Sequence, residues 1–205
     1  MKKQFKTIAL AGILLASNLT IAQEKEEVQT LFGGDSSIKK ENIGFFVAPL
    51  AGLTQMDGSN ASLLYLRGGI SFGDQLSLGA SFNTSMNEIR PESETIQDIY
   101  MDFWSLGGFA DFTVFSKKLM HLTIPLQINY GEVEMDNYQV DAGLGEANFV
   151  HIEPSALLEI NLHKYVRFNI GAGYRFISQV NYRNLNQTDL SGLTAYAGLK
   201  FGLFK

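Results

Sequence analysis

Apolar and polar side chains alternate along most of the chain after Asn42. The pattern is clearest in Val150–Leu162 and Val166–Phe176, two segments joined by His163-Lys164-Tyr165. Successive side chains of a β-strand point to opposite faces, so the pattern predicts a hairpin with one apolar face and one polar, charged face. Each arm is about twice as long as a usual soluble strand and suits a tilted strand that crosses a bilayer.

The same alternation recurs along the rest of the chain. A helix is not indicated, because the apolar residues return at every second position rather than at every third and fourth. The predicted strands are Ile43–Met56, Ala61–Phe72, Leu76–Asn87, Tyr100–Phe115, Met120–Tyr130, Val150–Leu162, Val166–Phe176 and Leu193–Phe204.

The connections between these strands alternate in length. The short ones are Gly73–Gln75, Ser116–Lys118 and His163–Tyr165. The long, polar ones are Asn87–Asp98, Glu132–Ala147 and Gln179–Ser191, with the modest Asp57–Asn60 on the same side. Bacterial outer-membrane barrels have short periplasmic turns, long outer loops and an even number of strands. The sequence therefore predicts an all-β, eight-stranded antiparallel up-and-down transmembrane β-barrel.

Four positions interrupt the predicted strands. Pro49, Pro125 and Pro154 lie mid-strand, where a proline removes a hydrogen bond of the sheet. The alternation in Tyr100–Phe115 also changes phase near Gly107. We expect β-bulges near all four positions.

The N-terminal residues predict export. Residues 1–22 combine a basic start, a short apolar run and the small-residue exit Thr20-Ile21-Ala22, which is typical of a cleaved signal peptide, with a retained anchor as the alternative. Residues 23–42 are polar and predict a flexible periplasmic segment, and residues 43–205 form the predicted barrel domain. The chain has no cysteine, which excludes lipoprotein attachment and disulfides.

The formal net charge of −5 makes the chain mildly acidic, and its sequence contains no Lys/Arg cluster of the kind that binds a nucleic-acid phosphate backbone. Nucleic acid is therefore not an expected partner.

The last strand resembles a known assembly signal. Tyr196 to Phe204 is similar to the terminal strand that the barrel-assembly machinery recognises, with Tyr196, Phe201 and Phe204 as its aromatic residues and Lys205 as a departure at the end. On the basis of this terminal strand and of the strand pattern, the chain resembles the small eight-stranded outer-membrane barrels of the OmpX and OmpW type. The segment Ile21-Ala22-Gln23, at the end of the predicted signal peptide, resembles the ends of Bacteroidetes signal peptides. The resemblance implies a bacterial outer-membrane location, with membrane lipids and the assembly machinery as partners, and transfers no catalytic motif.

The polar face of the hairpin holds the best candidate for a site. If His163–Tyr165 is a three-residue turn, Leu162 faces Val166, and Glu153 then lies opposite Arg175. In the same register Glu159 lies opposite Asn169, with Arg167 on its diagonal. Unpaired charges are costly in a narrow lumen, so they are expected to pair. The predicted lumen charge network is Arg67, Glu153, Glu159, Arg167, Arg175 and Lys200.

Two readings of this face remain open. An eight-stranded barrel is barely wide enough for its own side chains, which favours a packed polar plug over a selective polar pathway. His151 and Glu153 share a face and could begin a metal site, and Ser155 with His151 could form a nucleophile and its base. The first pair lacks further ligands. The second has poor geometry for a hydroxyl–imidazole hydrogen bond and no assured orienting acid, so no metal, cofactor or catalytic residue is expected.

The favoured hypothesis is a non-enzymatic outer-membrane barrel of structural or surface-interaction type, whose long loops would bind an extracellular ligand. The alternatives are a narrow channel or carrier for a small solute and an outer-membrane lipid-modifying enzyme. A soluble lipocalin-like barrel is the remaining reading, and it would need an apolar interior and a polar exterior.

Overall fold

The computed structural model describes residues 43–73, 75–96, 98–137, 142–178 and 180–204. The predicted signal peptide and periplasmic segment lie outside the described residues.

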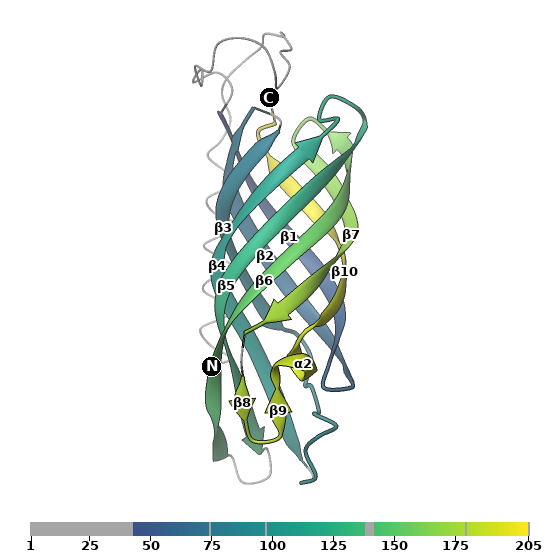
Figure 1. The fold of residues 1–205 in the computed structure, drawn as a ribbon. Coiled ribbons are helices and arrows are strands. Elements are labelled where there is room, and N and C mark those ends of the chain that lie inside the picture. The colour runs from purple at the N-terminus through teal and green to yellow at the C-terminus, as the bar shows by residue number, and fades with distance from the viewer. Residues whose placement is uncertain (1–42, 74, 97, 138–141, 179, 205) are drawn as a thin grey trace. The chain divides into compact units, whose positions relative to one another are not determined.

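Eight long antiparallel strands close into a barrel, which confirms the predicted fold (Figure 1). Each strand pairs with its neighbours in the chain, and the first pairs with the last to close the ring in the order β1-β10-β7-β6-β5-β4-β3-β2. The strands are β1 (Ile43–Met56), β2 (Ser59–Phe72), β3 (Leu76–Ser85), β4 (Ile99–Val114), β5 (Met120–Asn137), β6 (Ala142–His163), β7 (Val166–Ile177) and β10 (Gly192–Gly202).

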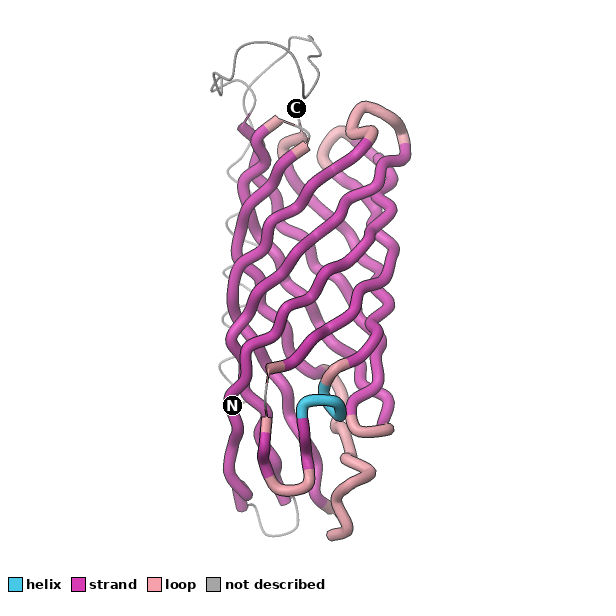
Figure 2. The backbone as a smooth tube through the Cα atoms, viewed as in Figure 1, coloured by secondary structure: helices cyan, strands magenta, loops and turns pink. Residues whose placement is uncertain are grey.

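The two ends of the barrel differ (Figure 2). One end carries the short turns between β2 and β3, β4 and β5, and β6 and β7, and we call the opposite end the outer end. There β4, β5 and β6 extend beyond the other strands, so residues that the sequence assigned to the loop Glu132–Ala147 are largely strand. The connection between β1 and β2 is only Asp57-Gly58, whose φ angles of 44° and 75° suit a tight hairpin turn of the primed type.

The connection between β7 and β10 folds over the outer end. It contains β8 (Asn181–Tyr182), β9 (Leu185–Asn186) and the short helix α2 (Gln187–Leu190). Asn186 caps the start of α2 through a reciprocal pair of hydrogen bonds. Its side chain accepts one from the backbone N–H of Thr188, and its own backbone N–H donates one to the side chain of Asp189. We call residues 180–191 the cap.

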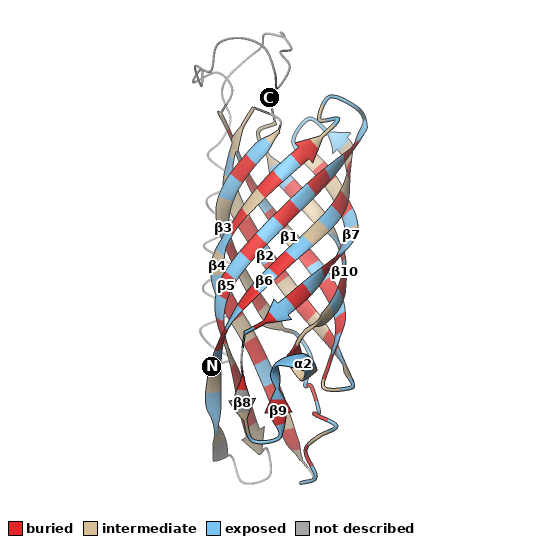
Figure 3. Cartoon of the chain, in the orientation of Figure 1, coloured by how far each residue is buried: buried red, intermediate tan, exposed pale blue. Residues whose placement is uncertain are grey.

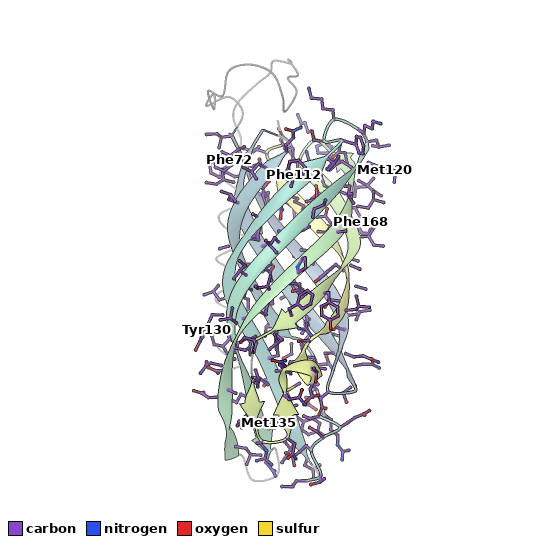
Figure 4. The ribbon with its side chains drawn as sticks, in the orientation of Figure 1. Phe72, Phe112, Met120, Tyr130, Met135 and Phe168 are labelled. Carbon is purple, nitrogen blue, oxygen red and sulfur yellow. The ribbon has the colours of Figure 1, made fainter. Side chains whose placement is uncertain are left out.

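Burial alternates along the strands as the sequence pattern predicts (Figure 3). On β5, Met120, Leu122 and Ile124 point outward and are exposed, whereas His121 and Thr123 point inward and are buried. Figure 4 shows the outward residues Phe112, Met120 and Tyr130 projecting from the wall of the barrel. This apolar exterior is the reverse of what a lipocalin-like soluble barrel requires.

The expected bulges at the prolines are absent, because the register runs unbroken through Pro49, Pro125 and Pro154. The backbone N–H and C=O of an antiparallel residue face the same neighbouring strand. Each proline therefore loses pairing on one side only and keeps its partner on the other, as Pro49 does with Leu66 on β2. The described register shifts lie elsewhere, at Glu134/Asp136 and Asn161/His163.

The expected bulge near Gly107 is also absent, since Gly107 pairs in continuous register with Ser81 and Asn129. The odd positions of β4 face inward throughout. What changes along the strand is the chemistry of the interior, from Asp111 and Thr113 near the short turns to apolar residues at the outer end.

These apolar residues pack with residues of the cap at the outer end of the buried hydrophobic cluster, and we call this part of the cluster the outer core. Its side chains come from β1, β2, β4, β5, the loop before β4 and the cap, and each is at most 5% exposed. They are Met56, Leu63, Ile89, Ile99, Met101, Phe103, Val133, Met135, Val180, Leu185 and Leu190. The barrel interior thus holds its buried charged residues along the lumen, with apolar residues such as Phe46, Leu50 and Phe109 among them, and is mainly apolar at its outer end.

Candidate functional site in the barrel lumen

All six residues of the predicted charge network face the lumen, and each is at most 7% exposed. They do not form one continuous network. The structure divides them into four groups at successive levels of the barrel, and each group includes partners that the sequence pattern did not identify.

The first group surrounds Glu159 near the short turns. Lys200 Nζ lies 3.0 Å from Glu159 Oε1, and Arg167 Nη1 lies 3.4 Å from Oε2. His121 Nε2 approaches the same Oε2 at 3.1 Å. Lys200 also lies over the Phe46 ring at 4.2 Å. One carboxylate is therefore bonded by two cations and an imidazole, which satisfies it in the dry interior.

The second group pairs Arg67 with Asp111, through a charge-assisted bond from Nη2 to Oδ1. The guanidinium also stacks on Phe109, 3.9 Å from the ring centroid. The pair spans β2 and β4 across the intervening β3, where Gly79 leaves room: a Cβ there would lie 2.7 Å from Phe109 Cζ. Sequence reasoning missed Asp111, because residues two strands apart share no hairpin register.

The third group holds Glu153 between two tyrosines. Tyr65 Oη donates to the carboxylate oxygens at 3.3 and 3.4 Å, and Tyr196 Oη donates to Oε1. The tyrosine rings meet edge to face at 5.1 Å. His151 Nε2 lies 3.7 Å from Glu153 Oε2. Glu153 is thus bonded by neutral hydroxyls rather than by an arginine.

The fourth group is Arg175, which is completely buried beneath the cap. Its Nε donates to the Leu190 carbonyl at 2.9 Å, and its guanidinium lies 5.3 Å from the Phe103 ring centroid. The register of β6 and β7 places Arg175 opposite Glu153, as predicted, but no ion pair joins them. The expected Glu153–Arg175 ion pair is wrong because both groups find other partners.

The turn of this hairpin also differs from the expected one. His163 pairs with Val166, so Leu162 does not face Val166 and the turn is two residues long. A bulge between Asn161 and His163 restores the predicted register, in which Asn161 pairs with Arg167. Glu159 therefore still lies opposite Asn169.

The lumen holds little free space between these groups. A cavity of about 20 Å³ lies beside Tyr65, Arg67, Gln127, Glu153 and Tyr196, which is room for about one water molecule. A smaller one of about 10 Å³ lies at the short-turn end, beside Arg167, Lys200 and Phe204. The described side chains therefore fill the barrel.

The residues weighed as metal ligands or catalysts lie inside this filled lumen. His151 Nε2 is 3.4 Å from the Gln127 amide, and its ring packs parallel to Phe103 and Phe149. Among the described residues, no group of three His, Cys, Asp or Glu side chains is placed to hold a metal ion. In the same part of the chain, no helix is long and apolar enough to cross a membrane.

The aromatic residues of the resembled assembly signal face different ways. Tyr196 points into the lumen, Phe201 points outward and is 43% exposed, and Phe204 lies under Arg167, 3.8 Å from the guanidinium carbon to the ring centroid.

A group of carboxylates lies on the outward face of the extended strands. We call Asp102, Glu132, Glu134, Asp136 and Glu146 the acidic patch. Register places Asp102 beside Glu134, and Glu134 beside Glu146. Burial first, and then the charge of Asp136, raise the pKa of Asp102 and that of Glu134 above their ordinary values.

Comparisons with known proteins agree with the fold. No protein-family model matches the chain, and no curated protein matches it. Among solved structures, the chain is similar to Neisserial surface protein A, with a TM-score of 0.58 and 8% identity over 78% of this chain and 96% of the other. It is also similar to the outer membrane protein OprG from Pseudomonas aeruginosa, with a TM-score of 0.50 and 9% identity over 80% of this chain and 97% of that one. The chain has the fold of the eight-stranded outer-membrane barrels.

Proposed function

We propose that this protein is a closed, non-enzymatic barrel of the bacterial outer membrane, with a structural or surface-interaction role. The observation that carries the proposal is a lumen filled by paired side chains and covered by the cap, inside a wall whose exterior is apolar. Its partners are outer-membrane lipids, the barrel-assembly machinery that reads β10, and an extracellular ligand at the outer end.

The apolar exterior supports the membrane location. Soluble monomers rarely expose contiguous apolar patches of more than a few hundred Å². Here large apolar residues face outward on all eight barrel strands, as hydrocarbon contact requires. This apolar belt includes Phe45, Val47, Leu66, Ile70, Leu76, Leu78, Leu106, Phe112, Met120, Leu122, Ile124, Leu126, Ile128, Ile152, Leu162, Ile170, Phe176, Leu193 and Phe201.

The filled lumen disfavours a channel or carrier. A solute on the path past Arg67, Glu153, Glu159 and Arg175 would have to displace groups that are hydrogen-bonded at each level. It would also have to pass the outer core and the cap. Eight-stranded barrels of this width hold their own side chains, which fits a structural interior.

The position of the enzyme candidates disfavours lipid modification. A lipid-modifying nucleophile must reach the membrane–water boundary, whereas Ser155 lies on the lumen side of β6 and His151 is completely buried. Among the described residues, the parts of the molecule that extend beyond the apolar belt include the cap and the acidic patch. An extracellular partner would therefore meet these surfaces first.

Single-cysteine labelling tests the location and orientation, since the chain contains no cysteine of its own. Thr188→Cys in the cap and Lys117→Cys in a short turn are both exposed positions. In intact cells a membrane-impermeant maleimide should label Thr188→Cys, and Lys117→Cys only after the outer membrane is permeabilised.

Labelling in the opposite order, or release of the protein without detergent, would overturn the proposal. As a control for folding, the protein in purified outer membranes should migrate differently in a gel before and after boiling, as a folded barrel does.

A further inference from the structure

The exposed lysines among the described residues all lie in two neighbouring short turns. Lys117 and Lys118 belong to the turn between β4 and β5, and Lys164 belongs to the turn between β6 and β7. Asn161 joins the two turns, because its Nδ2 donates to the Lys118 carbonyl at 3.2 Å and its backbone N–H donates to the Leu119 carbonyl at 3.0 Å. We call Lys117, Lys118 and Lys164 the basic rim.

No exposed carboxylate lies beside the basic rim in the described part of the chain. The segments 112–123 and 160–170, which contain both turns and the strand ends around them, include no Asp or Glu. The nearby Glu159 faces the lumen and is bonded to Arg167 and Lys200. The described outward side chains therefore carry positive charge at the short turns, whereas the acidic patch lies at the outer end.

Apolar surface adjoins the basic rim. Four large side chains in these two turns and at the adjoining strand end are each at least 44% exposed, namely Phe115, Leu119, Leu162 and Tyr165. The ammonium groups of Lys118 and Lys164 lie 5.0 and 4.9 Å from the ring centroids of Phe115 and Tyr165. The apolar belt continues directly from here, since Met120 begins β5 and faces outward (Figure 4). In a membrane the three lysines therefore lie where hydrocarbon gives way to lipid headgroups.

We propose that the basic rim binds the headgroups of anionic glycerophospholipids of the phosphatidylglycerol class. The proposal rests on the proposed function, which places the short turns in the periplasmic leaflet of the outer membrane. Lysine ammonium groups donate charge-assisted hydrogen bonds to phosphate oxygens, and each lysine near an anionic lipid surface adds to the attraction. A zwitterionic headgroup carries its own cation beside the phosphate, so it gains less from the same three lysines.

The surroundings of the lysines favour a lipid over a water-soluble anion. A soluble anion bound at Lys118 or Lys164 would leave the exposed Phe115 and Leu119 in water, whereas the acyl chains of a bound lipid would cover them. The outward carboxylates of the acidic patch repel anionic headgroups. Anionic lipid is therefore attracted to one end of the barrel and disfavoured at the other.

Quenching of tryptophan fluorescence by brominated lipids tests the proposal, because the chain has a single tryptophan. Leu119→Trp combined with Trp104→Phe places a reporter beside the basic rim. The unaltered protein is the matched reporter at the acidic patch, because Trp104 Nε1 donates to Glu132 at 3.2 Å. Each protein is refolded into phosphatidylcholine vesicles that contain the same proportion of either brominated phosphatidylglycerol or brominated phosphatidylcholine. Heat-dependent gel mobility confirms that the protein is folded.

The Leu119→Trp reporter should be quenched more strongly by the brominated phosphatidylglycerol, with a relative binding constant about 5-fold higher than that of phosphatidylcholine, as the attraction of one lysine implies. The preference should shrink in about 1 M sodium chloride, which screens exposed charges. Trp104 in the unaltered protein should show no such preference.

Variants of the reporter protein identify the groups responsible. Lys117→Gln, Lys118→Gln and Lys164→Gln together should abolish the preference for phosphatidylglycerol. Arg90→Gln removes an exposed cation from the loop before β4 at the outer end, so it is the matched control and should leave the preference unchanged.

Equal quenching of the Leu119→Trp reporter by the two lipids would overturn the proposal, and so would a preference that survives in the triple variant. If the triple variant does not fold, Lys164→Gln alone should reduce the preference, and an unchanged preference would count against the basic rim. Both leaflets of these vesicles have the same composition, so the result does not depend on how the protein is oriented. The cysteine-labelling experiment tests that orientation separately.

Discussion

Glu153 on β6 and Arg175 on β7 lie opposite each other in the sheet, yet each bonds to other groups. The carboxylate takes hydrogen bonds from Tyr65 and Tyr196, and the guanidinium holds the carbonyl of Leu190 in the cap. Interstrand position alone therefore does not decide which charges pair in this lumen. Hydrogen-bond donors on strands that are not paired with β6, here β2 and β10, compete for the carboxylate.

Removing the Tyr196 hydroxyl should destabilise the barrel. Tyr196→Phe deprives the buried Glu153 of a donor, and an unmade bond to a buried charged group costs about 1–3 kcal/mol. Urea unfolding of protein refolded into lipid vesicles measures the effect. Tyr130→Phe, an outward residue, is the control and should change stability little. Equal stability of the two variants would show that the hydroxyl is not needed.

Removing the charge of Glu159 should lower the free energy of unfolding more than removing the Tyr196 hydroxyl does. Glu159→Gln leaves Arg167 and Lys200 without their shared counter-charge, and breaking a buried ion pair costs about 3–5 kcal/mol. The double variant Glu159→Gln with Lys200→Met should recover part of the loss. The exposed Glu88→Gln should have no comparable effect in the same urea experiment. Additive losses in the double variant would contradict the pairing.

Shortening the side chain of Leu190 should destabilise the cap without unfolding the barrel. Leu190→Ala removes a completely buried side chain of the outer core, and such changes cost about 2–5 kcal/mol. Hydrogen exchange of cap amides should accelerate, while exchange in β2 and β3 stays slow. Uniform acceleration throughout the strands would mean that the cap and the barrel unfold together.

The extended parts of β4 and β5 should be more stable at mildly acidic pH than at neutral pH. The pKa values of Asp102 and Glu134 are raised in the folded protein, so their protonation favours the folded extension. Their contribution is present below the unfolded-state pKa of about 4 and is lost as the pH rises through the higher folded value. Hydrogen exchange corrected for its intrinsic pH dependence should show greater protection in β4 and β5 at mildly acidic pH than at neutral pH. Glu134→Gln should reduce that difference, and an unchanged difference would contradict it.

Alternation in the sequence predicted the strands, because the wall of the barrel separates hydrocarbon from a polar interior at every second residue. It also placed Glu159 opposite Asn169, because a bulge between Asn161 and His163 compensates for a turn that is one residue shorter than predicted. Partners that come from outside one short-turn hairpin, such as Asp111 for Arg67 and His121 for Glu159, were not predictable. Their strands are joined through intervening strands or long connections, and the alternation does not fix the register there.

The structure of the outer end differs from the one predicted from the sequence for a related reason. Ile99, Met101 and Phe103 reverse the chemistry of the inward face of β4, and the sequence pattern suggested a bulge. Only the fold shows that the cap covers this face, which makes apolar residues favourable inside. The acidic composition of residues 132–147 likewise suggested a loop, whereas the strands continue into water with their carboxylates outward.

The closed lumen is the central claim, and conductance across a planar lipid bilayer tests it most directly. The full-length protein, shown to be folded by its heat-dependent gel mobility, should leave the current at the level of the lipid alone across a range of voltages. Stable, repeated single-channel openings from that folded protein would contradict a barrel filled by its own side chains.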